Sequence, residues 1–168
     1  MFAARMSPLS WLLAALLFGT GGASRAAHAQ EAEPLAIVVN RSNPIDEISL
    51  GDLRRVFRGQ RGRWPNGRRV TLVMRDPGAP ERNALLQELY GLGEEDYRRG
   101  FLQAVFSGET SDAPKTLASA YGVLRFVFNV PGAIGYARAS EVDASVKILR
   151  VDGRLPGESG YQLEVDAQ

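Results

Sequence analysis

The chain has 168 residues, with 20 basic and 19 acidic side chains, and 45% of its residues are hydrophobic, which is typical of one globular domain. It has no cysteine, and its single histidine, His28, lies in a segment that we predict to be removed. The remaining chain therefore excludes disulfides, thiol nucleophiles, histidine-based catalytic triads and imidazole-bound metals. We expect no catalytic residues, no metal, no cofactor and no enzyme activity.

The first 29 residues are predicted to be a signal peptide that is cleaved after Ala29. Arg5 supplies a basic start, residues 9–18 form an apolar run, and Ala27-His28-Ala29 matches the small-residue cleavage signal. The run is shorter than the ~20 residues that span a bilayer, and an uncleaved anchor is the alternative. Cleavage removes two arginines and no acid, so the net charge changes from +1 to −1, which gives no general attraction for nucleic acid. We predict export to the periplasm and no transmembrane segment after cleavage.

The first half of the remaining chain alternates strand and helix patterns. Two mostly apolar, partly β-branched runs of five residues indicate buried strands, whereas Ser49 and Pro80 are residues that favour helix starts. The predicted elements are a flexible lead at residues 30–34, a strand at 35–39, a helix from Ser49, a loop at 59–69, a strand at 70–74 and a helix from Pro80 towards Gly91.

The second half continues the alternation and ends in a glycine-rich tail. The predicted elements are helices at residues 94–106 and from Asp112 onward, strands within 129–136 and 146–151, and a loosely ordered tail at 152–168. The stripes expected to face the core are Tyr97, Phe101, Leu102, Val105 and Phe106 in the first helix, and Leu117, Tyr121, Leu124 and Phe128 in the second. Strands separated by helices predict one α/β domain over residues 35–151, with a partly parallel sheet covered on its faces.

An arginine cluster falls on the first predicted helix and the loop after it. We interpret it first as a solvated face, because arginine is the usual cation throughout this chain. The alternative is a basic patch for an acidic partner, a phosphate-bearing ligand or anionic headgroups. The cluster consists of Arg54, Arg55, Arg58, Arg61, Arg63, Arg68 and Arg69.

A second basic feature lies between the strand at 70–74 and the helix from Pro80. Arg75 follows the strand directly, and a helix start presents unpaired N–H groups that suit an oxyanion. Ligands of open α/β sheets bind at this end of the strands. The candidate oxyanion site consists of Arg75, Gly78, Arg82 and Asn83, and the alternative is an ordinary strand–helix connection.

Several short motifs, taken in order, resemble the phosphate-type periplasmic substrate-binding proteins of ABC transporters. The match covers about residues 35–151. Its most specific motif is Pro131-Gly132-Ala133-Ile134-Gly135-Tyr136. The others are Asn40-x-x-Asn43-Pro44, Val56-Phe57-Arg58-Gly59, Trp64-Pro65-Asn66-Gly67 and Phe106-Ser107-Gly108. The resemblance implies a single lobe of the type II periplasmic-binding-protein fold, with a mixed, mostly parallel sheet flanked by helices.

The resemblance also bears on the candidate site. In the family, an arginine followed by a Gly-Ser-Gly-Thr turn grips the anion between two lobes. Here Arg75 and Gly78 match, whereas Ala79-Pro80-Glu81 replaces the hydroxyl-bearing residues and adds a negative charge. Two functions follow from this difference. The first is an exported solute-binding-protein-like domain with a degenerate site that binds a phosphate-like oxyanion weakly. The second is an envelope protein–protein interaction module that has lost ligand binding.

Overall fold

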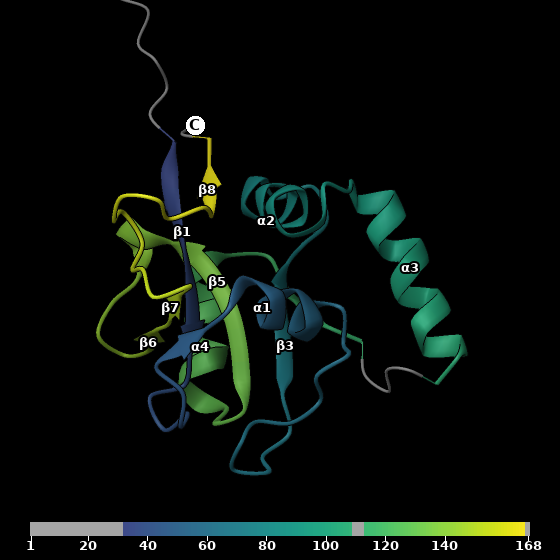
Figure 1. Ribbon diagram of the computed structural model, residues 1–168, viewed down its shortest axis with the longest axis horizontal. Helices are drawn as coiled ribbons and strands as arrows, with labels where there is room; N and C mark the ends of the chain where they lie inside the picture. The colour runs from purple at the N-terminus through teal and green to yellow at the C-terminus, as the bar shows by residue number, and fades with distance from the viewer. Residues whose placement is uncertain (1–31, 109–112, 167–168) are drawn as a thin grey trace, which may run out of the picture.

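β1 (Glu33–Val39) lies inside a mixed sheet and pairs with three other strands (Figure 1). In the computed structural model, which describes residues 32–108 and 113–166, the strand order is β4-β3-β5-β1-β6, and β8 pairs with the beginning of β1. The apolar run at 35–39 is fully buried, as the predicted strand requires. The other strands of this sheet are β3 (Thr71–Arg75), β4 (Lys115–Leu117), β5 (Ala133–Arg138), β6 (Lys147–Ile148) and β8 (Glu164–Val165).

Five of the six strands in this sheet point the same way. β3 is parallel to β4 and β5, while β1 runs antiparallel to β5, β6 and β8. The predicted α/β fold with a mixed, mostly parallel sheet is confirmed in this sense. A short parallel pair, β2 (Glu47–Ile48) with β7 (Arg150–Val151), lies beside it.

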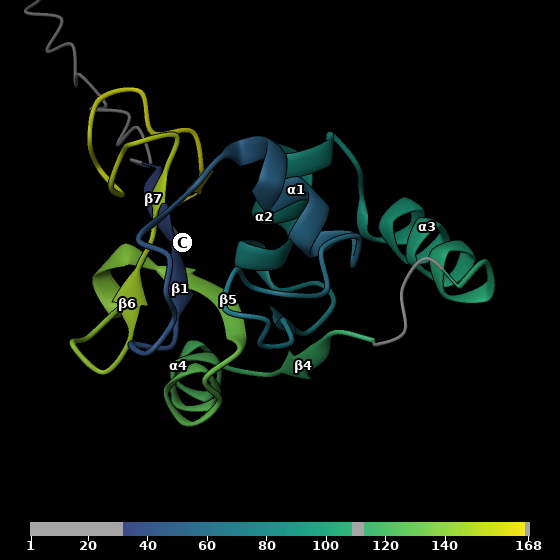
Figure 2. The ribbon, with the colours of Figure 1, turned by 60° about the horizontal axis from the view of Figure 1, so that its bottom comes forward.

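Helices cover both faces of the sheet (Figure 2). Alternate residues of β1 point to opposite faces, so Ile37 packs in the core on the side of α1 and α2, whereas Val38 packs against α4. No helix in the described part of the chain is long and apolar enough to cross a membrane. The helices are α1 (Leu50–Phe57), α2 (Pro80–Tyr90), α3 (Glu94–Phe106), α4 (Ala120–Asn129) and the short 3-10 turn η1 (Ala139–Glu141).

The predicted starts of the first helices are confirmed by their caps. The Ser49 hydroxyl accepts a hydrogen bond from the Asp52 N–H at 3.0 Å, and α2 begins at Pro80, which needs no N–H there. Gly91 ends α2 with a φ of +63°, a conformation that a residue with a Cβ adopts at a cost. These local rules act within a few residues, so the sequence alone locates these helix boundaries.

The glycines of the Pro131–Tyr136 motif have a packing role. A Cβ at Gly132 would lie 2.1 Å from the Arg69 carbonyl oxygen, and the Gly132 oxygen accepts the indole N–H of Trp64 at 2.9 Å. A Cβ at Gly135 would lie 2.8 Å from Val123 of α4. The motif therefore maintains close contacts of β5 with the loop before β3 and with α4.

The fourth predicted helix begins later than expected. Lys115–Leu117 forms β4, paired in parallel with β3, and α4 starts only at Ala120, with Ser119 as its cap. The predicted stripe was partly wrong for the same reason: Leu124 is buried, but Tyr121 and Phe128 are exposed. Val123 and Val127 face the sheet in their place. The start at Asp112 lies outside the described residues.

The stripe predicted for α3 is also largely wrong. Tyr97 is buried and Phe101 is half-buried, but Leu102, Val105 and Phe106 are exposed, Phe106 to 88%. α3 packs against the domain mainly through its N-terminal half and projects away from the sheet (Figure 1). An apolar pattern with helical spacing identifies a helix but not the surface that covers its apolar side.

The two ends of the described chain pair with each other, so residues 33–34 of the predicted flexible lead and residues 164–165 of the predicted loose tail belong to the sheet. Residues 30, 31, 167 and 168 lie outside the described part. Glu33 and Pro34 of β1 pair with β8, at the end of the chain. The hydroxyl of Tyr161 donates to the Leu35 carbonyl at 2.7 Å, and Leu163 is fully buried. The glycines that suggested disorder instead form tight turns, so the packed domain extends beyond residues 35–151. The predicted signal peptide, residues 1–29, lies outside the described part.

Candidate oxyanion site

The predicted connection between β3 and α2 is present at one end of the sheet. Arg75 is the last residue of β3, and a turn with Gly78 at a φ of +87° leads into α2. The Ala79 carbonyl accepts hydrogen bonds from the N–H groups of Arg82 and Asn83, both at 3.0 Å. Arg75 and Gly78 thus lie at the carboxyl end of a strand that pairs in parallel with its neighbours.

The carboxylate of Glu81 lies between two arginines at this site. One oxygen accepts a hydrogen bond from Nε of Arg138 at 2.8 Å, and the other lies 3.3 Å from Nη1 of Arg75. Glu81 is only 5% exposed, although it belongs to the first turn of α2. A carboxylate therefore occupies the space between the two guanidinium groups.

Arg138 extends the cluster towards the beginning of β1. It is the last residue of β5, and its Nη1 donates to the carboxylate of Glu33 at 3.0 Å. Glu33 also accepts a hydrogen bond from the hydroxyl of Ser140. Arg75, Arg138, Glu81 and Glu33 carry two positive and two negative charges, so the cluster is neutral overall.

The electrostatics favour the ionised form of Glu81. Burial raises the pKa of its carboxyl, but hydrogen bonds from its own N–H and from Arg138, with the charges of Arg75 and Arg138, lower it more, and the pKa lies below its usual value. Nε of Arg75 and one oxygen of Glu81 are buried without a hydrogen-bond partner in the described chain. The pair is therefore held mainly by charge and lacks full hydrogen bonding.

The remaining predicted residues do not point into the cluster. The guanidinium of Arg82 pairs with both oxygens of Glu94 at 2.6 and 2.7 Å, and its Nη1 donates to the Arg75 carbonyl at 2.9 Å. Asn83 is exposed on the outer side of the first turn of α2. Of the four predicted residues, only Arg75 interacts with Glu81, while Gly78 lies in the turn before α2.

Sequence reasoning missed Arg138. The sequence could have indicated it, because Arg138 follows the buried residues of β5 just as Arg75 follows the buried residues of β3. The two strands are parallel neighbours, so both arginines emerge at the same sheet end. No group of acidic or histidine side chains in the described residues is suited to hold a metal ion.

Comparisons with known proteins agree with this arrangement of strands and helices. No protein-family model matches the chain. The phosphate-binding protein PstS 2 of Streptococcus agalactiae is 31% identical over 85 residues, which cover 51% of this chain and 27% of that protein. An ABC-type phosphate transport receptor from Vibrio cholerae has a TM-score of 0.65 at 19% identity, over 82% of this chain and 55% of that one.

A third similarity is to PstS from Borrelia burgdorferi, with a TM-score of 0.64 at 14% identity, over 80% of this chain and 55% of that chain. The chain spans about half the length of these two solved relatives, and its match to the curated relative spans about a quarter of that protein. The fold is therefore that of one lobe of a periplasmic binding protein. The relationship to phosphate-type substrate-binding proteins that the sequence motifs predicted is confirmed.

Proposed function

We propose that this chain is an exported solute-binding-protein-like domain in which Glu81 takes the place of a bound oxyanion. The observation that carries the proposal is the buried Glu81 carboxylate between Arg75 and Arg138, at the start of α2. Helix starts and paired guanidinium groups are the features that bind phosphate-like anions. The names of the relatives make phosphate the first ligand to test.

Glu81 makes oxyanion binding weak in this proposal. A free anion can contact Arg75 and Arg138 only if the carboxylate moves aside, because two like charges 4 Å apart repel each other by about 4 kcal/mol near a protein surface. Pro80 also removes one N–H from the helix start. The site is degenerate in this sense: the two arginines are present, but the carboxylate of Glu81 in the same chain neutralises their charge.

The test is calorimetric titration of the protein with phosphate, sulfate and molybdate, repeated on the variant Glu81→Thr. Removing the carboxylate and adding a hydroxyl should strengthen phosphate binding roughly ten-fold or more, equivalent to about 1.4 kcal/mol. Adding Arg75→Ala or Arg138→Ala to Glu81→Thr should abolish the gain. Glu88→Thr is the matched control, because Glu88 is exposed on the same helix and should leave binding unchanged.

Circular dichroism and thermal unfolding show whether each variant is folded. Phosphate should raise the melting temperature of Glu81→Thr, because a ligand that binds only the folded state stabilises it. Glu81→Gln provides a second variant that retains the shape of the side chain. If both variants are folded and neither binds phosphate at millimolar concentration, the oxyanion site is rejected.

Export is the second part of the proposal. It rests on the basic start, apolar run and cleavage signal of residues 1–29. The mass of the protein recovered from the cell envelope should correspond to a chain that begins at Gln30. Recovery of a membrane-bound chain that begins at Met1 would contradict this.

A protein–protein interaction module in the cell envelope is the second candidate function. The specific observation in its favour is the exposed apolar side of α3, which projects from the domain and carries Phe106 at 88% exposure. Exposed apolar patches of this kind mark contact surfaces in soluble proteins. This candidate requires no ligand at the Glu81 cluster.

A further inference from the structure

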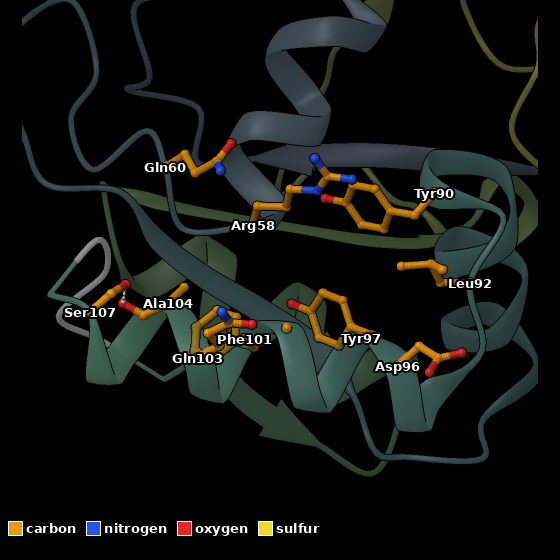
Figure 3. Close-up of a pocket in the computed structure, with 11 residues that line it drawn as sticks. Arg58, Gln60, Tyr90, Leu92, Asp96, Tyr97, Phe101, Gln103, Ala104 and Ser107 are labelled. Atoms are coloured by element: carbon orange, nitrogen blue, oxygen red, sulfur yellow. Dashed lines mark hydrogen bonds between the residues drawn. The ribbon is translucent and has the colours of Figure 1, made fainter.

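A groove runs between α3 and the segment that follows α1 (Figure 3). Its volume is about 360 Å³, which is within the range of sites that hold a small molecule or one large side chain. The residues that define it are Arg58, Gln60, Tyr90, Leu92, Tyr97 and Phe101. None of them belongs to the cluster around Glu81.

One wall of the groove is a row of aromatic rings. The ring centroids of Tyr90 and Tyr97 are 6.2 Å apart, and those of Tyr97 and Phe101 are 6.0 Å apart. Both phenol hydroxyls are already used, because Tyr90 donates to the Arg54 carbonyl at 2.6 Å and Tyr97 to the Phe57 carbonyl at 2.9 Å. The tyrosines therefore present apolar ring surface to the groove and have no further hydroxyl proton to donate.

Arg58 lies at the rim of the groove. Its guanidinium lies 4.6 Å from the centroid of the Tyr90 ring and takes part in no ion pair in the described chain. The acid that lines the groove, Asp96, already pairs with Arg99 at 3.4 Å. Stacking on Tyr90 holds Arg58 in position while leaving its N–H donors available.

The segment around Arg58 is strongly basic. Residues 50–69 contain seven arginines and a single acid, Asp52, which pairs with Arg55 and Arg61. Of these arginines, Arg58 lines the groove. A positive charge beside a row of aromatic rings favours a partner that carries an acidic side chain next to an apolar one.

The apolar surface extends a short way beyond the groove along α3. Phe101 lines the groove, and Val105, one turn further along the helix, is exposed. Leu102 and Phe106 lie on the other side of α3 and do not belong to this surface. A segment of another protein can contact the groove and Val105 together, whereas a small molecule in the groove leaves Val105 in water.

We propose, building on the second candidate function, that the groove binds an acidic segment of a partner protein. An apolar or aromatic side chain of the partner packs against the rings of Tyr90, Tyr97 and Phe101, and a neighbouring carboxylate pairs with Arg58. The paired charges determine which segments bind, and the aromatic wall contributes the buried contact area.

The test is selection of random short peptides displayed on phage against the immobilised protein, followed by affinity measurements on the enriched peptides. Enriched sequences should combine an aromatic or aliphatic residue with a nearby Asp or Glu, and their affinity should fall as salt is raised. Arg58→Glu should weaken binding at least about ten-fold. Gly100→Trp should block it, because a Cβ at Gly100 meets no atom within 4 Å and the added ring fills the groove.

The matched control is Arg125→Glu, which makes the same charge change on exposed α4 at the opposite face of the sheet. It should leave peptide binding unchanged. The proposal is overturned by enrichment of peptides without acids, by failure to enrich any peptide, or by peptides that bind Arg58→Glu as well as the parent. It is also overturned if sedimentation shows that α3 mediates self-association, with Phe106→Ser restoring the monomer.

Discussion

Glu81 couples the stability of the domain to pH. In the folded state the pKa of the Glu81 carboxyl lies below its usual value. Its contribution to stability is therefore fully present at a pH above the pKa of the unfolded state, and it is lost as the pH falls through the pKa of the folded state. Glu33 behaves in the same way, chiefly because Ser140 donates a hydrogen bond to it. Urea unfolding should therefore show a free energy of unfolding that decreases below about pH 5.

Glu81→Gln tests this coupling. At pH 7 the variant should be about 2 kcal/mol less stable, because two arginines lose their shared anion. Its stability should depend less on pH between 5 and 3 than that of the parent, since the titrating group is absent. Parallel pH curves for the two proteins would show that Glu81 is not one of the groups responsible.

Two glycines should respond oppositely to replacement by alanine. Gly100 lies inside α3 with open space around it, so Gly100→Ala should stabilise the protein by about 0.5–1 kcal/mol. Gly91→Ala should destabilise it by about 1 kcal/mol, because its φ of +63° is unfavourable for alanine. Urea unfolding of both variants measures the difference, and the same sign for both would contradict this account.

The helix α4 provides a test of which side chains face the sheet. Val127 is fully buried against β-strand residues, whereas its neighbour Phe128 is exposed. Val127→Ala should cost about 2 kcal/mol of stability, while Phe128→Ala should change it by less than about 0.5 kcal/mol. Thermal or urea unfolding measures the two effects. A larger loss of stability for Phe128→Ala than for Val127→Ala would support the core-facing side that the sequence predicted for this helix.

The packed C-terminal segment makes the domain one unit from Glu33 to β8. Leu163 is fully buried, and its carbonyl accepts a hydrogen bond from the Leu35 N–H at 2.8 Å. Leu163→Ala should destabilise the protein by about 2–5 kcal/mol and leave a single unfolding transition. Gln162→Ala, at an exposed neighbouring position, should have almost no effect. Equal stability of the two variants would show that this segment contributes little to the packed domain, as the sequence-based prediction of a loosely ordered tail implies.

Local rules account for the features that the sequence predicted well. The bounds of α2 and α3, the cap at Ser49 and the buried strand β1 depend on residues within one or two turns of each other. The motif glycines Gly132 and Gly135, just before and within β5, supported the relationship to phosphate-type binding proteins, since their close contacts leave no room for a side chain. Arg75 and Gly78 could be located because a strand end and a helix start mark the connection.

Contacts between distant segments decided the rest. Arg138 reaches Glu81 across 57 positions and Glu33 across 105, and Arg82 is drawn to Glu94 on the next helix. The sequence alone indicated most of the element types and the family resemblance, and the absence of cysteine excluded disulfides and thiol chemistry. Tertiary structure decided which helix faces are buried, that β8 joins β1, and that Glu81 neutralises the candidate site, because sheet pairing brings together side chains that no local pattern relates.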